Sequence, residues 1–332
     1  MLQRILVPLD GSVFADQALP HALAVARALD GRLLLLHVLE ATPEDHAAIV
    51  DPVDWRFRRT RARRKLERTA DDLGADGFTV ETRLAEGLAA DEIVQAARDW
   101  PADLLVLTSY GRRGCRPGPQ GSTTTKVVAQ GRTSVLVVPP ASSPALEALA
   151  RPATYRRILV ALDGSPPGDA ALGLAHALAR PGPAEILLAH VVPVPELIHG
   201  ATPLAGGDIL MREEVVSRNR RQAEAYLDRC ARICRRPGLS CRVLLGQSTR
   251  VHHTLAGMIQ DEQPDLVLLS AHGQGSEAAP PTCPYGVVSG HVLAWAGVPR
   301  LVVQDPSTAV AAVPAAAIGH AVRQPLNWAP HP

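Results

Sequence analysis

The sequence lacks the long apolar run and the charge imbalance that mark membrane proteins and nucleic-acid-binding proteins. No segment approaches the roughly 18 uninterrupted apolar residues that a membrane-spanning helix needs. The formal net charge is only +1, so no overall field draws the chain to nucleic acid or to an anionic membrane. The first residues form a strand pattern that meets Pro8 and Asp10, without the apolar segment of a signal peptide. We therefore expect a cytoplasmic protein with no membrane and no nucleic-acid partner.

Cysteines are few, and the common catalytic motifs are missing. The five cysteines show no framework spacing, which indicates free thiols in a reducing compartment. Cys230 and Cys234 continue an apolar helical stripe, so we predict buried core residues there and no metal site with Cys241 or the downstream pair His252-His253. GxxxxGK[ST], GxSxG and HExxH patterns are absent, as is a carboxylate pair in matching loops. The sequence therefore predicts no catalytic residues, and a weak ATPase would lack an evident general base.

What the sequence does contain is one long internal repeat. The segment ILVPLDGS ending at Ser12 returns as ILVALDGS ending at Ser165, so that Asp10 matches Asp163 at an offset of 153 residues. A repeat of this length is a copied domain, because solenoid units are typically about 20–50 residues long. We predict a first domain over 1–139, a linker over 140–154 and a second domain over 155–304. The Ala/Pro-rich tail over 305–332 has no periodicity and is predicted to be disordered.

Each half alternates strand and helix patterns. Continuously apolar runs such as Leu33–Val38 are typical of strands buried on both faces of a parallel sheet. Helical spacing follows Ser12, a plausible N-cap, with a kink expected at Pro20 and a C-terminal stop at Gly31. Each half is therefore predicted to be an open, doubly wound, Rossmann-like α/β domain. Further helices are expected from Trp55 to Leu73, from Ala89 to Trp100 and after Ser122.

Two strand ends of the first half carry residues suited to an anionic ligand. The first strand ends in Pro8-Leu9-Asp10, and the fourth ends in Leu107-Thr108 before Gly111. After nine intervening residues, Gly121 precedes a helix start at Ser122-Thr123, where free amides and the helix dipole attract an anion. In a doubly wound sheet, ligands bind beyond the carboxyl ends of the strands. Arginines close to this loop would add positive charge, and they are Arg112, Arg113 and Arg116.

These residues resemble the glycine motif of the universal stress protein family, and the chain is similar to a tandem member. The family's ATP-binding members carry G-x-x-G-x9-G-(S/T), which matches Gly111, Gly121 and Ser122, with Thr108 in place of the first glycine. The resemblance implies that Asp10 and the main chain at Val38 hold adenosine. It also implies a cytoplasmic stress-response regulator that binds ATP, and pairing through the final strands, within the chain or in a homodimer. Its protein partner is not identified by the sequence.

Two alternatives stay open. Both loops could be structural, which would make the chain a nucleotide-free interaction or dimerisation module. In the second half nine residues follow Gly273, and Cys283 then stands where the motif has glycine. Gly286 comes three residues later, and Val287 replaces the hydroxyl. Three prolines in that loop also remove amide donors, so only the first half is predicted to bind phosphate. The basic helix over Arg56–Arg68 is interpreted as a solvated face, with a partner surface as the alternative.

Overall fold

A single sheet runs through the whole molecule. The computed structural model describes residues 2–40, 52–111, 121–130, 133–140, 151–179, 183–195, 206–234, 237–273, 285–295 and 297–304. Five strands come from the first half: β1 (Arg4–Pro8), β2 (Arg32–Leu39), β3 (Val80–Glu86), β4 (Leu104–Thr108) and β5 (Ser134–Val138). Five come from the second: β6 (Arg157–Ala161), β7 (Ala184–Pro193), β8 (Leu239–Ser248), β9 (Leu266–Ser270) and β10 (Arg300–Val303).

The strand order is β3-β2-β1-β4-β5-β10-β9-β6-β7-β8. Pairing is parallel within each half, and the order reverses at β1 in the first half and at β6 in the second. Each half is thus an open, doubly wound α/β sheet, as the alternation of apolar runs predicted. The reversal points place the carboxyl ends of β1 and β4 side by side, which is where a ligand site is expected.

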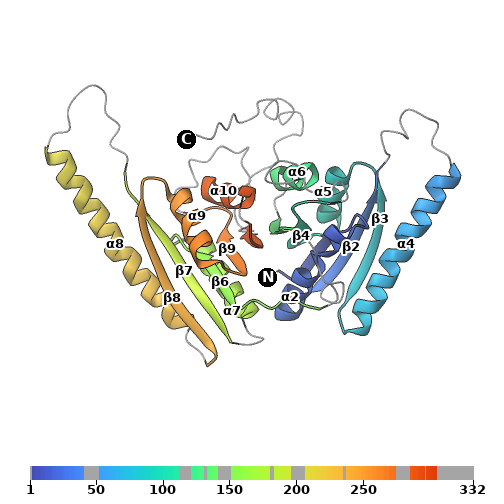
Figure 1. The fold of residues 1–332 in the computed structure, drawn as a ribbon, viewed down its shortest axis with the longest axis horizontal. Coiled ribbons are helices and arrows are strands. Elements are labelled where there is room, and N and C mark those ends of the chain that lie inside the picture. Colours follow the sequence, from blue (N-terminus) through green and yellow to red (C-terminus); the bar gives the residue numbers. More distant parts are fainter. Residues whose placement is uncertain are drawn as a thin grey trace, which may run out of the picture.

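Helices cover both faces of the sheet (Figure 1). One core lies between the sheet and α2 (Leu19–Leu29), α4 (Pro52–Ala75), α7 (Pro166–Leu178) and α8 (Gly206–Cys234). The other lies between the sheet and α5 (Ala89–Asp99), α6 (Ser122–Gln130), α9 (Val251–Glu262) and α10 (Val287–Trp295). A short helix, α1 (Val13–Asp16), follows β1. No helix in the described part of the chain is both long and apolar enough to cross a membrane.

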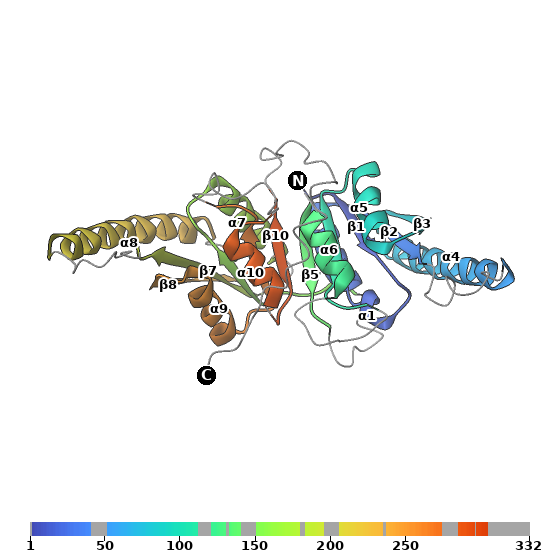
Figure 2. The ribbon, with the colours of Figure 1, turned by 90° about the horizontal axis from the view of Figure 1, so that it is seen from above.

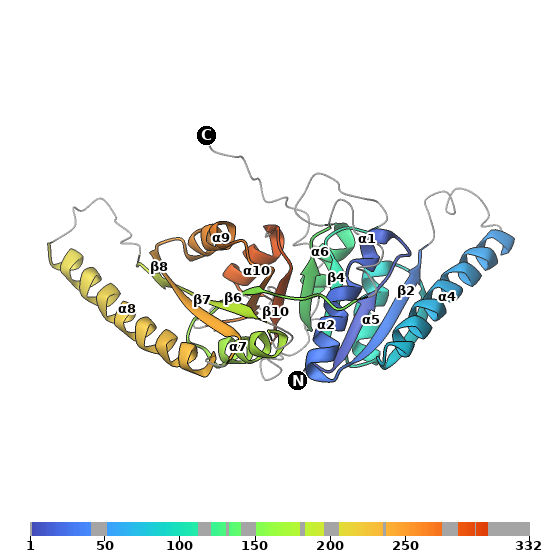
Figure 3. The same ribbon diagram turned by 60° about the horizontal axis from the view of Figure 1, so that its bottom comes forward.

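The two halves meet through their last strands, as predicted from the matching apolar edges. β5 and β10 pair antiparallel with Leu301 opposite Leu136, and Figure 2 shows them adjacent at the centre of the molecule. Beneath this junction α2 contacts α7, as the view in Figure 3 makes clear. The hydroxyl of Tyr285 donates to the carbonyl oxygen of Thr133 at 3.2 Å. The intrachain pairing of the two domains is therefore confirmed.

The prediction from the sequence was less accurate for the first helix and its end. Instead of one helix kinked at Pro20, the chain forms α1 and α2, with Pro20 in the first turn of α2, where its missing amide donor costs nothing. The left-handed residue at the end of α2 is Asp30 (φ 53°) and not Gly31. A β-carbon at Gly31 would lie 3.0 Å from the carbonyl oxygen of Gln3, so close packing and not backbone torsion requires glycine there.

The long helix α4 agrees with the interpretation of a solvated basic face. Its buried residues are Ala62, Leu66 and Leu73, and its arginines lie on the exposed or half-buried surface. Some of its basic residues also make specific contacts that the sequence did not indicate, such as Arg58 with the carbonyl oxygen of Glu40 at 2.9 Å. Lys65 Nζ donates to the carbonyl oxygen of Gly11 at 3.1 Å and to Asp16 Oδ2 at 2.8 Å. The helix thereby fastens the turn that follows β1.

Candidate functional site

The Asp10 carboxylate lies at the reversal point of the first half. Gly11 turns the chain with φ of 80°, which favours glycine, and Ser12 then caps α1. Asp10 Oδ1 accepts hydrogen bonds from the Ser12 amide at 2.9 Å and from its hydroxyl at 2.5 Å. A β-carbon at Gly111 would lie 2.5 Å from Asp10 Oδ2. Glycine at position 111 therefore lets the chain after β4 pass directly against the carboxylate.

A second glycine closes the loop between β4 and α6. The Gly121 amide donates to the carbonyl oxygen of Ser109 at 2.7 Å, and a β-carbon at Gly121 would lie 3.0 Å from that oxygen. The hydroxyl of Thr124 donates to the carbonyl oxygen of Thr108 at 2.9 Å. α6 begins at the exposed Ser122, and the first-turn amides of a helix have no acceptor within that helix. The arrangement holds the start of α6 at the carboxyl end of β4.

Thr108 adopts ordinary strand geometry. It pairs with Val138 in the parallel ladder of β4 and β5, and it is not among the described residues with positive φ. Its side chain is 7% exposed, and its hydroxyl donates to the carbonyl oxygen of Tyr110 at 2.7 Å. Threonine in place of the family's first glycine therefore brings no backbone strain, and its only possible obstacle to a ligand is its volume.

The other predicted site residues fall into two groups. Leu9 and Leu107 are buried in the core, so only their main chain can face a ligand, and the Leu9 amide already donates to the carbonyl oxygen of Leu36 at 2.7 Å. Pro8, Val38 and Thr123 are half-buried at the ends of β1, β2 and at the start of α6. Arg112, with its neighbours Arg113 and Arg116, lies outside the described residues. The structure thus places Gly111 against Asp10, and it places Gly121 and Ser122 at the carboxyl end of the adjacent strand β4.

The second half repeats this geometry more closely than its sequence suggested. Asp163 accepts from the Ser165 amide and hydroxyl, and a β-carbon at Gly273 would collide with its carboxylate. The Gly286 amide donates to the carbonyl oxygen of Ala271 at 2.7 Å, which is the counterpart of the Gly121 bond. The sequence prediction that Gly286 comes too late to match was therefore wrong, because Gly286 makes the same bond as Gly121 although three more residues precede it. Among the described residues the difference that remains is Val287, which is 77% exposed where the first half has Ser122. The three prolines of this loop, Pro280, Pro281 and Pro284, lie outside the described residues.

A buried arginine of the second half supports the loop of the first. Arg300, in β10, is 1% exposed, and its guanidinium donates to the carbonyl oxygens of Leu293 at 3.0 Å and Val298 at 3.3 Å. Its Nη2 reaches the hydroxyl of Ser109 at 3.5 Å, and Ser109 is the residue whose carbonyl holds Gly121. Burial lowers the pKa of Arg300 to about 10, so the side chain stays charged at neutral pH. The only sequence signal was one arginine opening an otherwise apolar strand.

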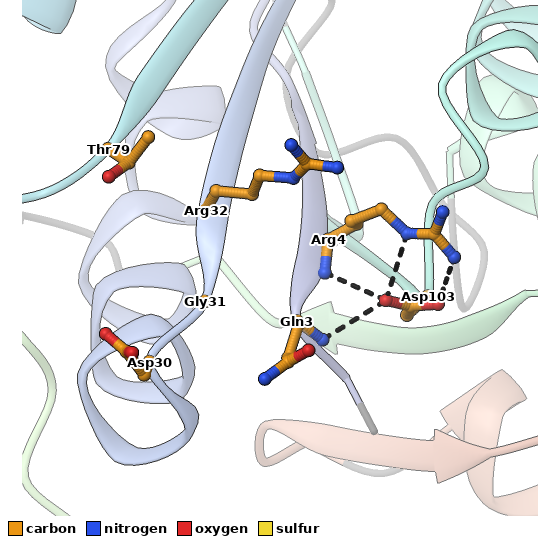
Figure 4. Close-up of a pocket in the computed structure, with 7 residues that line it drawn as sticks. All are labelled: Gln3, Arg4, Asp30, Gly31, Arg32, Thr79 and Asp103. Atoms are coloured by element: carbon orange, nitrogen blue, oxygen red, sulfur yellow. Dashed lines mark hydrogen bonds and ion pairs between the residues drawn. The ribbon is translucent and has the colours of Figure 1, made fainter.

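A cavity lies at the amino-terminal edge of the sheet, opposite the candidate site. It measures about 630 Å³ and is lined by Gln3, Arg4, Asp30, Gly31, Arg32, Thr79 and Asp103 (Figure 4). Asp103 accepts from the amides of Gln3 and Arg4 and pairs with the Arg4 guanidinium at 2.9 Å. Its counterpart Asp265 accepts from two amides at the start of β6. These acidic residues therefore anchor the first strand of each half. We infer a structural role for the side chains that line this cavity.

Comparison with known proteins agrees with this architecture. A model of the universal stress protein family matches residues 1–139 and 154–304. A universal stress protein of Thermus aquaticus is 33% identical over 144 residues, which cover 42% of this chain and 99% of the relative. One from Methanocaldococcus jannaschii is 26% identical over 145 residues, which cover 42% of this chain and 82% of the relative. Each relative therefore corresponds to about one half.

Two solved structures span both halves. A universal stress protein from Archaeoglobus fulgidus aligns with a TM-score of 0.55 at 18% identity, over 91% of this chain and 98% of its own. A functionally unknown protein from Pseudomonas aeruginosa aligns with a TM-score of 0.58 at 14% identity, over 91% and 92%. At these identities the likeness concerns the fold alone. Because the family model matches both halves, the chain belongs to the universal stress protein family, as a tandem member.

Proposed function

We propose that the first half binds an adenine nucleotide, ATP foremost, and that the chain acts as a stress-response regulator and not as a fast enzyme. The observation that carries the proposal is the contact between Asp10 and Gly111 beside the Gly121 turn. One edge of the sheet thereby offers a carboxylate for hydroxyl groups and a helix start for an anion. ATP has both kinds of group, a ribose and a phosphate chain.

Each part of this edge has a distinct role in the proposal. Asp10 accepts hydrogen bonds from ribose hydroxyls, and the main chain at Val38 meets the adenine ring. The amides at Ser122 and Thr123 donate to phosphate oxygens, which the dipole at the start of α6 also attracts. Arg112 adds a cation to the same phosphates. No general base belongs to this set, so binding without rapid hydrolysis is the expected behaviour.

Titration calorimetry with ATP tests the proposal, and the two halves supply a matched pair of variants. Gly121→Val and Gly286→Val each place a side chain against an equivalent carbonyl oxygen, with β-carbon distances of 3.0 Å and 3.2 Å. We expect one nucleotide per chain, lost in Gly121→Val and retained in Gly286→Val. Each amide donor that the phosphate chain loses costs about 1–3 kcal/mol of binding free energy. The loss of two donors therefore lowers the affinity for ATP roughly a hundredfold.

The alternatives predict different results in the same experiments. Two equivalent sites, or loss of binding only in Gly286→Val, would show that the second half is the nucleotide domain. No heat of binding at millimolar ATP would favour the nucleotide-free module, and Thr108→Gly then tests whether side-chain volume is the obstacle. Prolonged incubation with detection of ADP distinguishes a weak ATPase from a protein that only binds.

The junction between the halves shapes the proposed assembly. Pairing of β5 with β10 already occupies, within one chain, the edges through which the resemblance expects two chains to associate. A homodimer would have to use another surface. Sedimentation velocity with and without ATP measures whether such a dimer forms and whether nucleotide alters it.

A further inference from the structure

Three histidines of the second half gather on two neighbouring helices. His252 and His253 lie in the first turn of α9, and His291 lies in α10, beside it in Figure 1. The ring centroids are 4.5 Å apart for His252 and His253, 4.6 Å for His252 and His291, and 5.6 Å for His253 and His291. One nitrogen of each ring lies within 4.8 Å of the other two. His253 is exposed and the other two are half-buried, so solvent reaches the cluster from one side.

We propose that His252, His253 and His291 form a binding site for a divalent transition-metal ion, with Zn²⁺ as the best match. Imidazole nitrogen suits Zn²⁺, Cu²⁺ and Ni²⁺, whereas Mg²⁺ and Ca²⁺ prefer oxygen ligands. Zn–N bonds of about 2.0–2.1 Å in a tetrahedron separate the nitrogens by about 3.4 Å. The nitrogens, now within 4.8 Å, must therefore close by at most about 1.4 Å, which side-chain rotation supplies without moving either helix.

Each ring would coordinate a metal as the neutral imidazole. Two helices provide the ligands, so a bound ion would tie the start of α9 to the middle of α10. Three protein ligands leave a fourth position for water or an anion.

The first half has no counterpart of this cluster. Asp103 matches Asp265 at an offset of 162 residues, so His252 and His253 correspond to Ala90 and Asp91. Gly121 matches Gly286 in the structure, so His291 corresponds to Lys126. The metal site is therefore a property of the second copy, whose α10 lacks the serine that opens α6.

Zinc chloride titration of the untagged full chain, in competition with a chromophoric chelator, tests the site. We expect one high-affinity Zn²⁺ per chain and at least about tenfold weaker binding in each of H252A, H253A and H291A. The matched control is H272A, which removes a half-buried histidine of the same half that lies outside the cluster. His253 is exposed, so H253A tests the site without disturbing the core. Equal affinity in all four variants, or no binding at about 100 µM Zn²⁺, would overturn the proposal.

Cobalt substitution identifies the ligands directly. Nitrogen ligation gives only the visible d–d bands of tetrahedral Co²⁺, whereas a thiolate adds a strong near-ultraviolet charge-transfer band. We expect the first spectrum, lost in H291A. A thiolate band would assign the metal to the cysteines and overturn the histidine site. Zinc should also raise Tm of the parent chain and of H272A but not of H253A, because only a metal bound to the native state stabilises it.

Discussion

A half-buried histidine at the junction of the halves makes stability depend on pH. His21 in α2 lies with Nδ1 2.7 Å from the hydroxyl of Tyr155, which precedes β6 and is 4% exposed. Next to this pair the Ala153 amide donates to the carbonyl oxygen of Pro20 at 2.7 Å. Burial lowers the pKa of His21 from 6.5 to about 4. The folded chain therefore keeps a neutral imidazole where the unfolded chain would take up a proton.

The sign and size of the effect follow from that shift. Between pH 6.5 and about 4 the unfolded state binds more protons, so the stabilising contribution is complete above pH 6.5 and is lost as the pH falls. At pH 5 the loss relative to pH 8 is about 2 kcal/mol, because one pKa unit corresponds to about 1.4 kcal/mol. Since the ring is only half-buried by surface area, this figure is an upper value.

Urea unfolding at pH 8, 6.5 and 5, followed by circular dichroism, measures the loss. The reference is the double variant His21→Leu with Tyr155→Phe, which removes the titrating ring and leaves no buried hydroxyl without its acceptor. We expect the free energy of unfolding of the parent chain to fall by about 2 kcal/mol more than that of the variant. Parallel pH profiles would refute the reasoning, as would an NMR titration of the His21 ring near pH 6.5.

Three further outcomes follow from the described contacts. Gly111→Ala puts a methyl group against the carboxylate after β1, so calorimetry should give at least about tenfold weaker ATP binding, whereas Gly273→Ala, its second-half match, should leave affinity unchanged. Arg300→Met removes the guanidinium that donates to the carbonyl oxygens of Leu293 and Val298, the first bond buried and the second part-buried, and should cost about 1–3 kcal/mol in thermal unfolding; an unchanged or higher Tm would contradict this. Burial raises the pKa of the Cys230 thiol in α8, so alkylation of Cys230, followed by mass spectrometry, should be at least about tenfold slower than that of the half-buried Cys241. Equal alkylation rates would show that α8 opens readily.

The strands could be predicted because burial on both faces leaves a direct mark on composition. Leu33–Leu36 and Leu104–Leu107 are apolar throughout, and the structure buries both runs in strands that have a neighbour on each side. The break between α1 and α2 could not be read the same way, since apolar spacing continues across it. Whether Pro20 kinks a helix or starts one depends on the turn before it, which the Lys65 contact with Gly11 and Asp16 helps to hold.

The candidate site was predictable as far as strand order governs it. Asp10 and Gly111 follow strands that a doubly wound sheet must place side by side, so their proximity needed no further information. Contacts between residues that are far apart in the sequence could not be predicted from its pattern. Arg300 is 191 residues from Ser109, and His291 joins His252 from another helix. The match of Gly286 to Gly121 could not be predicted either, because the number of residues in a loop does not determine where its last residue lies.

The antiparallel junction of β5 and β10 has a consequence for how two copies of one domain can become different. Tethered halves meet at an effective concentration of about millimolar, so their pairing no longer depends on how much protein the cell makes. The junction also discriminates between partners. Arg300 reaches the hydroxyl of Ser109, whereas a pair of two β10 strands would bury two guanidinium groups, each facing Ala271 in place of that serine. We therefore expect two identical halves to pair less well than the two different halves of one chain, and such a preference would leave each copy free to acquire a ligand of its own.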